Sequence, residues 1–513
     1  MVFWLSPAGS WKLEAGSWKL VIVMAGPKAS SHLLLLHGAC SSSACFKLPA
    51  FSFQLRHTRR SKTDIRPFMR PPRFDQLHRQ PGPWFVALGG AGMFGANFYL
   101  YGSGGEWIAI DCGFALNATP SGRNSVSVPS LSALERHDIK LSAILITHGH
   151  EDHIGAIPHI WRAMDCPIYA SPFAARLIRA KLDPGLTWPR IHEIQPLEPI
   201  GIGAFQAEWI PVTHSIPESH AIMLDVAGKR LYHSGDWKLD AQPVVGGLTA
   251  QGRLQALGRQ GVDVIIGDST NAPVAGASRT EAAVQNGLQD AIKPCSQRVI
   301  VTCFASNLAR LHSLAEIAFD CGRYAALLGR SLVNMHGFGR AQGYLNSRPG
   351  YIGPWELGHL PREQQMWICT GSQGEPAAAL GRLASGNHPQ LSLEPGDTVV
   401  FSSRLIPGNE EALARIKQGL KEQGVQIIDD DMAPIHASGH PPQEDLRELY
   451  GWLKARYLLP VHGELYHQQA HMQFGRSLGL GGLVPNNGDL IDLSAQPCKV
   501  AELPHGLVEL QQR

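Results

Sequence analysis

The segment HGHEDH places three histidines and an aspartate close together in the chain. It follows an apolar run, residues 143–147, that is typical of a β-strand. Alternate residues of an extended stretch share a face, so His148 and His150 can face one ion, while Asp152 and His153 begin the next turn and can face a second. Imidazole and carboxylate groups are the ligands of zinc and similar divalent ions. The segment therefore predicts a metal site at the carboxyl end of a strand, where α/β sheets place their chemistry.

Further histidine and aspartate side chains stand at the ends of other apolar runs. His214, Asp236 and His462 each follow such a run, far apart in the sequence. A single histidine beside a strand is more often structural than a ligand, so each of the three is a weak signal alone. Together with the HGHEDH segment they supply the ligands that a pair of ions requires. An aspartate between two ions can bridge them, and a hydroxide held in the same way is a strong nucleophile at neutral pH.

The elements that must position these residues follow two patterns. Up to about residue 248, apolar runs broken by glycine-rich turns predict strands at 84–88, 97–101, 106–111, 143–147, 205–211, 221–226 and 230–233, with helices at 154–164 and 172–182. Beyond that point strands (262–267, 298–302) and helices (281–292, 308–319) alternate, which is typical of a parallel α/β unit. Two later helices are predicted at 410–423 and 441–454 from their apolar stripes.

One glycine-rich segment imitates a dinucleotide-binding loop. Residues 90–95 match GxGxxG, and Asp111 follows at about the spacing that the nucleotide fingerprint needs. The fingerprint also requires a helix after the glycines, whereas the residues that follow here are strand-like. The sequence therefore argues against a Rossmann nucleotide site.

Length and composition indicate a globular protein of several domains. The 513 residues exceed one ordinary core, and the 44% hydrophobic and 17% charged residues are typical of folded proteins rather than of fibres or disordered chains. No apolar run approaches the length of a membrane span. The nine cysteines are scattered without a CxxC pair, which favours a reducing compartment over a disulfide framework and predicts a cytoplasmic location.

Residues 1–68 differ from the rest of the chain. They carry nine Lys or Arg and only two acidic residues, are rich in serine, repeat the pentapeptide GSWKL and show no steady hydrophobic period. Two interpretations stay open: a targeting peptide, which would place the protein in an organelle, or a start upstream of the true initiator Met69. We expect this extension to be disordered or non-native. The remaining residues hold 36 Lys and Arg against 41 Asp and Glu, so an interaction with nucleic acid there requires a local patch or bound metal.

The motifs of residues 84–493 together resemble those of the β-CASP nucleases of the metallo-β-lactamase superfamily, and most closely the ribonuclease J family. The HxHxDH pattern alone would indicate only the superfamily. The narrower match rests on residues 147–158 (THGHEDHIGAIP), 214–217 (HSIP), 234–236 (SGD), 268–271 (DSTN), 304–307 (FASN), 370–376 (TGSQGEP), 406–410 (IPGNE), 436–440 (HASGH) and 461–464 (VHGE).

The resemblance implies a ligand set and a cofactor. One ion would be held by His148, His150 and His214, and the other by Asp152, His153 and His462, with Asp236 bridging. Asp111 would orient a ligand from behind. The implied cofactor is two divalent ions, first of all Zn²⁺, with Mn²⁺ or Mg²⁺ as substitutes in an assay.

The resemblance also implies a reaction and its substrate. Asp152, Asp268 and His440 would be the catalytic residues, with His440 contacting the scissile phosphate or protonating the leaving oxygen. RNA-processing members carry a histidine at the position of His462, so the implied substrate is single-stranded RNA. The activity would be 5′-to-3′ exonucleolytic on RNA with a 5′-monophosphate, with endonucleolytic cleavage as well. Small or hydroxylated residues near turns, with one arginine, are candidate phosphate contacts: Ser306, Arg330, Ser372, Ser403, His436, Ser438 and His440.

The fold that the resemblance implies is a metallo-β-lactamase αββα sandwich with an inserted β-CASP α/β domain. We expect the sandwich at residues 69–247 and 431–513 and the insertion at 248–430. The small C-terminal dimerisation domain of the family is expected to be missing, which leaves homo-oligomer formation open. Met93 and Ala96 stand where the family usually carries an acidic residue and a lysine. That departure affects no expected metal ligand.

Two other functions compete with this one. A small-molecule hydrolase of the same superfamily, such as a lactonase or a thioesterase, would lack the long insertion and its TGSQGEP and IPGNE motifs. A non-catalytic RNA-binding scaffold would have lost metal ligands, and every expected ligand is present in this sequence. We therefore expect a zinc-dependent ribonuclease, with no membrane association.

Overall fold

The computed structural model describes residues 79–118, 124–185, 189–346, 350–405 and 409–510, together with four strands in the first 68 residues. The chain divides into two compact units, Met1–Phe68 and Met69–Arg513, which are described separately. Met69 itself and residues 406–408 of the IPGNE motif lie outside the described residues. No helix in the described part of the chain is long and apolar enough to cross a membrane.

The first unit contains a small antiparallel sheet. Its strands are β1 (Val2–Leu5), β2 (Ser10–Ala15), β3 (Trp18–Val23) and β4 (Leu35–His37), paired in chain order. The two copies of the GSWKL repeat supply the neighbouring strands β2 and β3, in which Leu13 pairs with Leu20. That residues 1–68 are disordered or non-native stays a prediction.

The second unit opens with an eight-stranded mixed sheet in the order β13-β12-β11-β8-β7-β5-β27-β28. Its strands are β5 (Trp84–Gly89), β7 (Phe98–Ser103), β8 (Glu106–Ile110), β11 (Leu141–Leu145), β12 (Ile168–Ala170), β13 (Ile191–Glu193), β27 (Asp489–Asp492) and β28 (Cys498–Glu502). Side chains alternate between its faces, so that Val86 packs into one hydrophobic core and its neighbour Phe85 into another. Both faces of this sheet are therefore covered.

A seven-stranded sheet packs against the first, in the order β14-β15-β16-β17-β18-β24-β26. Its strands are β14 (Ile200–Ile202), β15 (Phe205–Pro211), β16 (His220–Val226), β17 (Lys229–His233), β18 (Val264–Asp268), β24 (Tyr457–Val461) and β26 (Gly481–Gly482). Trp209 lies in the core between the sheets, and its indole nitrogen donates a hydrogen bond of 2.9 Å to the carbonyl of Ile146. The contact joins the second sheet to the end of β11, where the HGHEDH segment starts.

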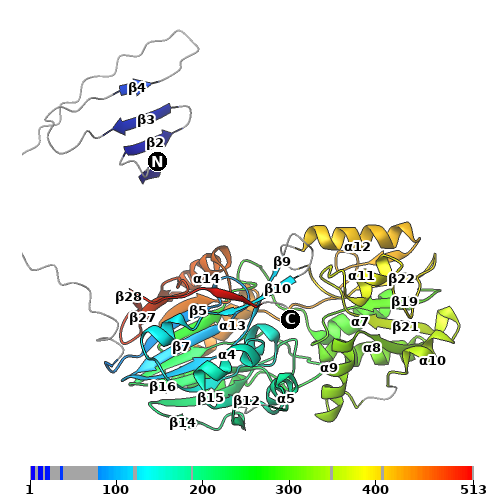
Figure 1. The fold of residues 1–513 in the computed structure, drawn as a ribbon, viewed down its shortest axis with the longest axis horizontal. Helices are drawn as coiled ribbons and strands as arrows, with labels where there is room; N and C mark the ends of the chain where they lie inside the picture. The colour runs from blue at the N-terminus through cyan, green and yellow to red at the C-terminus, as the bar shows by residue number, and fades with distance from the viewer. Residues whose placement is uncertain are drawn as a thin grey trace, which may run out of the picture. The chain divides into compact units, whose positions relative to one another are not determined.

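Helices cover the two outer faces of this pair of sheets (Figure 1). α4 (Ile157–Met164) and α5 (Pro172–Lys181) pack on the first sheet, and α6 (Gln251–Gln260), α13 (Gln443–Leu453) and α14 (Leu465–Ser477) pack on the second. The amphipathic stripes of these helices bury their apolar residues against the strands. The four layers form the αββα sandwich that the sequence predicted.

A separate five-stranded parallel sheet forms the inserted domain, in the order β20-β21-β19-β22-β23. Its strands are β19 (Val299–Thr302), β20 (Tyr324–Leu328), β21 (Gln365–Cys369), β22 (Thr398–Phe401) and β23 (Gln426–Ile428), and its helices are α7 (Glu281–Ile292), α8 (Leu308–Asp320), α9 (Arg330–Ala341), α10 (Pro354–Gly358), α11 (Ala379–Ala384) and α12 (Glu410–Glu422). Val301 and Ile300 face separate cores on the two sides of the sheet, as a buried parallel sheet requires.

The predicted domain boundary at residue 248 requires correction. β18, expected to open the α/β insertion, instead pairs in parallel with β17 and β24 of the sandwich. Those two neighbours satisfy the backbone hydrogen bonds of β18 on both sides, so the strand is central to the second sheet. The chain contributes a strand to the inserted sheet only from Val299.

Short elements complete the second unit and settle two further expectations. They are β6 (Ala91–Gly92), β9 (Ala115–Ala118), β10 (Asn124–Pro129), β25 (Gly463–Glu464), β29 (Leu507–Leu510), α2 (Ser132–Arg136), α3 (Glu151–Ile154) and a 3₁₀ turn at Arg362–Gln364. The helix predicted at 154–164 is in fact the two helices α3 and α4, interrupted at Gly155.

The glycine-rich segment 90–95 leads into strand β7 and not into a helix, as the argument against a nucleotide site required.

The topology gathers polar residues at one edge of the sandwich. β8 and β11 are parallel in the first sheet, and β17, β18 and β24 are parallel in the second, so their carboxyl ends meet at a common edge. Asp111 follows β8, Asp236 lies beyond β17, Asp268 ends β18 and His462 follows β24. Asp111 and His462 have positive φ angles of 62° and 53°. Such non-glycine conformations persist only where the surroundings impose them, and they cluster at functional sites.

The crossing of α6 and α13 generates a stability prediction. A Cβ added at Gly258 would lie 1.9 Å from the carbonyl oxygen of Trp452, so Gly258→Ala must push the two helices apart. We expect a loss of about 1–3 kcal/mol in the free energy of unfolding, measured by thermal denaturation. Gly252→Ala on the same helix is the matched control, because nothing lies within 4 Å of its added Cβ. An equal Tm for the two variants would contradict this packing.

Candidate metal centre

The HGHEDH segment lies at the carboxyl end of β11, as predicted. His150 has extended backbone angles (φ −72°, ψ 154°) at the N-cap of α3, and Asp152 and His153 lie within that helix. The change from extended chain to helix turns the first two histidines and the last two ligands toward different points. The segment therefore contributes to two groups of ligand atoms rather than one.

The first group consists of three imidazoles and one carboxylate. His148, His150, His214 and Asp236 each offer one ligand atom, and these atoms all lie within 4.8 Å of one another. Nδ1 of His150 is 3.1 Å from Nε2 of His148 and 3.0 Å from Nε2 of His214. Three ring nitrogens directed at one point are the arrangement of ligands around a cation.

The second group consists of two imidazoles and two carboxylates. Its members are Asp152, His153, Asp236 and His462. Oδ2 of Asp152 is 3.1 Å from Nε2 of His462 and 3.4 Å from Nε2 of His153. Asp236 belongs to both groups and is only 3% exposed, so its carboxylate lies between them. The nitrogen and oxygen donors of both groups fit zinc or a similar divalent ion.

Hydrogen bonds from behind fix the orientation of the histidines. Nδ1 of His153 is 2.7 Å from Oδ2 of Asp111, whose other oxygen accepts from the backbone N–H of Thr147 at 2.9 Å. Nδ1 of His214 is 2.6 Å from the carbonyl oxygen of Gly439. These partners take up the proton-bearing nitrogen, so the other nitrogen of each ring is left to bind metal. Asp111 therefore lies behind the His153 ring, on the side away from the second group.

Ser306 contacts one of the proposed metal ligands. Its hydroxyl is 3.1 Å from Nε2 of His150, the ring nitrogen that faces away from the first group. The expectation was a phosphate contact for this serine. The structure shows a hydrogen-bond partner that holds the His150 ring, contributed by the inserted domain.

Asn97 is a residue at this site that the sequence reasoning missed. It is fully buried, and its amide nitrogen is 3.0 Å from the backbone oxygen of Asp152, 3.3 Å from Oδ2 of Asp152 and 3.0 Å from Nε2 of His153. Its oxygen accepts from the hydroxyl of Tyr99 at 2.8 Å. The only signal in the sequence was a polar residue at the start of an apolar strand, which is also common at turns.

A third cluster adjoins the second ligand group. Asp268, 1% exposed, places Oδ2 at 2.8 Å from Nδ1 of His440 and Oδ1 at 3.4 Å from Nδ1 of His462. The hydroxyl of Thr270 donates to Oδ1 of Asp268 at 2.7 Å. Because Asp268 engages Nδ1 of His440, the Nε2 atom of that ring is the one available to a substrate.

Burial and charge divide the histidines into two classes. Burial lowers the pKa of His148 and His214 well below the usual range, and that of His150 to about 4. Burial would also lower the pKa of His153 and His462, but neighbouring carboxylates, Asp236 first among them, outweigh it and raise both well above the usual range. The three histidines of the first group are therefore predominantly neutral in the metal-free protein at neutral pH, whereas His153 and His462 hold protons.

A cavity of about 740 Å³ adjoins His440. It is lined by residues from the sandwich and from the inserted domain, and four of the predicted substrate contacts belong to it: Ser403, His436, Ser438 and His440. Its charged lining residues are Arg279, Arg404 and Lys417 with Glu410, Asp429, Asp430 and Asp431, and Arg279 is paired with Asp430 at 2.7 Å. Ser372 is buried and Arg330 is exposed at the start of α9, and neither lines this cavity.

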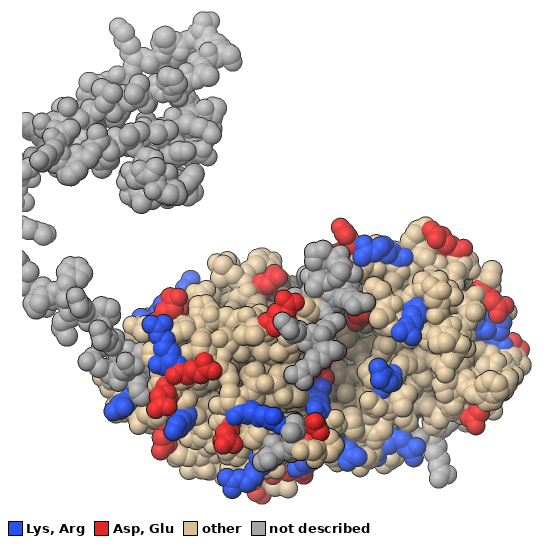
Figure 2. All heavy atoms as spheres, in the orientation of Figure 1, with Lys and Arg blue, Asp and Glu red and all other residues tan. Residues whose placement is uncertain are grey.

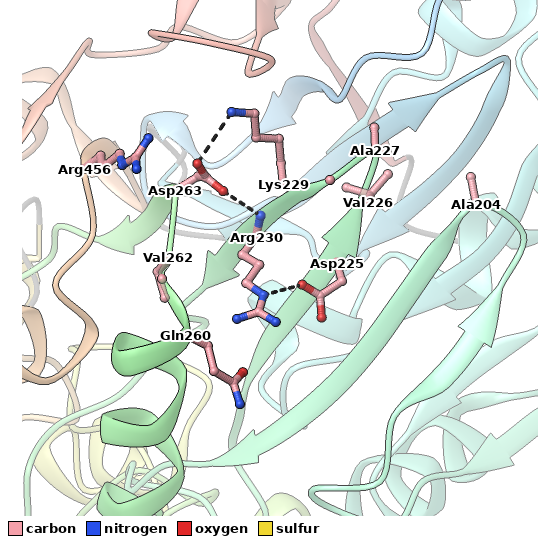
Figure 3. A pocket seen from close by; sticks show the side chains of 12 residues that line it. Ala204, Asp225, Val226, Ala227, Lys229, Arg230, Gln260, Val262, Asp263 and Arg456 are labelled. Carbon is pink, nitrogen blue, oxygen red and sulfur yellow. Dashed lines mark hydrogen bonds and ion pairs between the residues drawn. The ribbon is translucent and has the colours of Figure 1, made fainter.

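A second cavity, of about 570 Å³, lies at the opposite edge of the second sheet (Figure 3). It surrounds the amino-terminal ends of β17, β18 and β24, away from the ligand groups. Two of its three cations are paired, because Lys229 lies 3.6 Å from Asp263, and Nε of Arg230 lies 3.0 Å from Asp225; Arg456 is the third. On the face drawn in Figure 2, basic and acidic side chains are also interspersed, without one broad basic field.

Comparison with known proteins gives the class of this fold and site. Residues 91–257 match the family profile "Metallo-beta-lactamase superfamily", residues 296–420 match "Ribonuclease J, beta-CASP domain", and residues 430–479 match "Zn-dependent metallo-hydrolase RNA specificity domain". A solved structure from Enterococcus faecalis, of a protein of unknown function, covers 80% of this chain with a TM-score of 0.54 and 13% identity, and it supports the fold alone. The chain is a metal-dependent hydrolase of the metallo-β-lactamase superfamily with a β-CASP insertion.

Relatives define the family within that class. Ribonuclease J of Sinorhizobium meliloti is 39% identical over 83% of this chain and 77% of its own length. Ribonuclease J 1 of Streptococcus pyogenes is 35% identical over 81% and 75%, and ribonuclease J of Thermus thermophilus is 33% identical over 82% and 76%. The chain belongs to the ribonuclease J family, and the lactonase or thioesterase alternative is not favoured.

Metal binding should stabilise the folded chain. The unfolded chain lacks the two assembled ligand groups, so added Zn²⁺ or Mn²⁺ should raise the Tm in a concentration-dependent manner. His153→Ala removes a ligand of the second group and should reduce this rise, whereas His159→Ala, exposed on α4, should keep it. The measurement is thermal denaturation with and without metal. An equal rise in the wild type and in His153→Ala would count against the assigned ligands.

The pKa directions predict that the two ions are lost at different pH values. Binding an ion to the second group displaces protons from His153 and His462, whose pKa values are raised, so protons compete there at higher pH. As pH falls, the second group should therefore release its ion before the first. Metal content after dialysis at decreasing pH should fall in two steps, and His462→Ala should abolish the step at higher pH. A single step in the wild type would contradict the assignment.

Proposed function

We propose that this protein is a ribonuclease that hydrolyses phosphodiester bonds of single-stranded RNA. The observation that carries the proposal is the arrangement of two ligand groups sharing Asp236, with His440 beside them in the lining of a cavity formed jointly with the β-CASP domain. The family profile for RNA specificity, which matches residues 430–479, spans His436, His440 and His462. We further propose 5′-to-3′ exonucleolytic action on RNA with a 5′-monophosphate, with some internal cleavage.

The proposed cofactor is a pair of Zn²⁺ ions. His148, His150 and His214 would hold one, Asp152, His153 and His462 the other, and Asp236 would bridge them. When bound, such ions supply a hydroxide nucleophile at neutral pH and neutralise phosphate charge. Mn²⁺ or Mg²⁺ would serve in an assay, because the carboxylates of the second group also suit harder ions.

His440 is the proposed general acid. The Asp268 carboxylate holds its Nδ1 at 2.8 Å and, together with Asp236, outweighs the effect of partial burial and raises the pKa of the ring above its usual value. A protonated ring presents Nε2–H to the oxygen that leaves when the phosphodiester bond breaks. Asp268 thus orients His440 and keeps it charged, while its other oxygen steadies His462.

The cavity beside His440 is the proposed binding site for the phosphate nearest the cleaved bond. Ser403, His436 and Ser438 line it with small or neutral polar groups, and Arg404 adds positive charge, whereas Arg279 is paired with Asp430. Arginine and serine side chains bind phosphate oxygens without reading the base. Contacts from Ser306, Ser372 and Arg330 stay as predictions of the sequence, as do a cytoplasmic location and homo-oligomer formation.

The direct test uses the full chain and single-stranded RNA with a 5′-monophosphate, labelled at the 5′ end and internally. With Zn²⁺, Mn²⁺ or Mg²⁺ present, mononucleotides should be released from the 5′ end, and His153→Ala should abolish this release. Internal fragments would shift the assignment toward an endonuclease. Intact RNA with folded, metal-loaded protein would overturn the proposed function, and small esters and lactones would then be tested.

Replacement of the proposed acid gives a sharper test. His440→Ala should lower kcat by about 10²–10⁴-fold, the usual contribution of a positioned proton donor. It should leave two ions per chain, because His440 is outside the two proposed ligand sets. RNA with a better leaving group at the cleaved bond should recover part of the rate. His388→Ala, on the surface of the inserted domain, is the control, and a rate equal to that control would exclude His440 as the acid.

A further inference from the structure

Four charged side chains form a buried cluster where the sandwich meets the inserted domain. Lys238 and Asp240 belong to the loop after β17, Glu281 begins α7, and Arg310 lies on α8. Their exposed fractions are 1%, 4%, 3% and 0%. Two positive and two negative groups therefore share a site that water does not reach.

Glu281 is the centre of this charge cluster. Its Oε1 is 3.3 Å from Nζ of Lys238 and its Oε2 is 3.0 Å from Nη2 of Arg310, so each carboxylate oxygen faces one domain. Nζ of Lys238 is also 3.0 Å from Asp240, which accepts from the backbone N–H of Glu281 at 2.9 Å. The glutamate thus joins a cation of the sandwich to a cation of the inserted domain.

On the sandwich side, the charge cluster is connected to the two loops that carry Asp236 and His214. Lys238 and Asp240 follow shortly after Asp236 in the sequence. The hydroxyl of Thr213, the residue before His214, donates to the carbonyl of Lys238 at 2.6 Å and accepts from the N–H of Asp240 at 3.2 Å. A movement of Lys238 would therefore shift the backbone that carries Asp236 and His214.

On the other side, Arg310 holds the backbone of the substrate cavity. Its Nη1 donates to the carbonyl of Ile435 at 3.0 Å and to the carbonyl of Ser402 at 3.3 Å. The hydroxyl of Ser402 donates to the same Ile435 carbonyl at 2.7 Å. The next residues along these two segments, Ser403 and His436, line the cavity.

The charge cluster is better suited to fixing geometry than to adding stability. Removing four charges from water costs most of what their attraction returns, so such clusters stabilise a fold little compared with apolar packing. Their directional contacts, however, allow one arrangement of the groups. Burial alone would raise the pKa of Glu281, but Arg310 and Lys238 outweigh it and lower the pKa to about 2, so the side chain stays ionised at neutral pH.

We propose that Glu281 is a positioning residue that sets the substrate cavity relative to the metal centre, by holding Lys238 on one side and Arg310 on the other. The inference rests on the proposed function, because the geometry it fixes is that between a bound phosphodiester and the ligand groups. The domain junction would thus contribute to turnover by keeping the cavity and the metal centre in a fixed relative position, which no metal ligand or cavity residue does.

The test compares two variants that each remove one buried carboxylate charge between two cations. Glu281→Gln acts at the domain junction. Asp397→Asn is the matched control: Asp397 is 0% exposed and lies 3.1 Å from Arg298 and 2.7 Å from Arg362, at the start of β22, the end of the inserted sheet away from the cavity. For each variant, kcat, KM, bound metal per chain and amide hydrogen exchange are measured on the full chain, well below its Tm.

Glu281→Gln should lower kcat by roughly 10- to 100-fold, as misplacement of a reacting group by about 1 Å does, with metal content unchanged. Amide exchange should become faster at residues 435–438 and 402–403. Asp397→Asn should keep kcat near the wild-type value, and Glu281→Asp, which retains the charge, should recover part of the loss. Equal kcat values in the two charge-removing variants would overturn the inference. If the wild type cleaves no RNA, the proposed function fails instead, and unchanged exchange at 435–438 would still refute the positioning role.

Discussion

One buried carboxylate oxygen is the constraint around which this site is built. Oδ2 of Asp236 lies 3.2 Å from Nε2 of His153 and 3.6 Å from Nε2 of His462, with ring nitrogens of His148, His214 and His440 at 3.8–3.9 Å. Five imidazoles around one anion in a buried place can share protons or bind metal. Protons occupy only the second ligand group, whereas two divalent ions would use the directed nitrogens of His148, His150, His214, His153 and His462 and leave His440 on Asp268. The chemistry of the donors therefore favours a two-ion centre.

The fold produces this constraint by topology rather than by local sequence. The ligands come from the ends of parallel strands in two different sheets, and the packing of the sheets brings those ends together. All of the proposed metal ligands therefore belong to the αββα sandwich. The inserted domain supports one of them and forms part of the cavity beside His440. Ser306 on His150 and Arg310 on the cavity segments are the contacts through which the insertion acts. The inserted domain thereby adds a substrate cavity for a polymer to the hydrolytic centre that the superfamily fold provides.

Sequence reasoning succeeded where residue type alone restricts the chemistry. The HGHEDH segment indicated a metal site from residue type and spacing, whereas Asp236 and His462 gained weight only beside it, and the four-layer fold followed from the resemblance to the ribonuclease J family. It was incomplete where function depends on distant packing. Asn97 was missed because the sequence does not distinguish a buried amide at the start of a strand from a polar turn residue. β18 was assigned to the wrong domain because a central parallel strand has the same apolar sequence pattern in either sheet. The role of Glu281 depends on charges that only the folded chain brings together.

The most direct test of the central claim is an anomalous-scattering map of crystals grown with Zn²⁺ or Mn²⁺. Two peaks are expected, one among His148, His150 and His214 and the other among Asp152, His153 and His462, with the Asp236 carboxylate between them. Separation of the peaks by about 3.5–4 Å would be that of a two-metal hydrolytic site. A single peak, or peaks away from Asp236 in crystals with fully ordered ligands, would contradict the account.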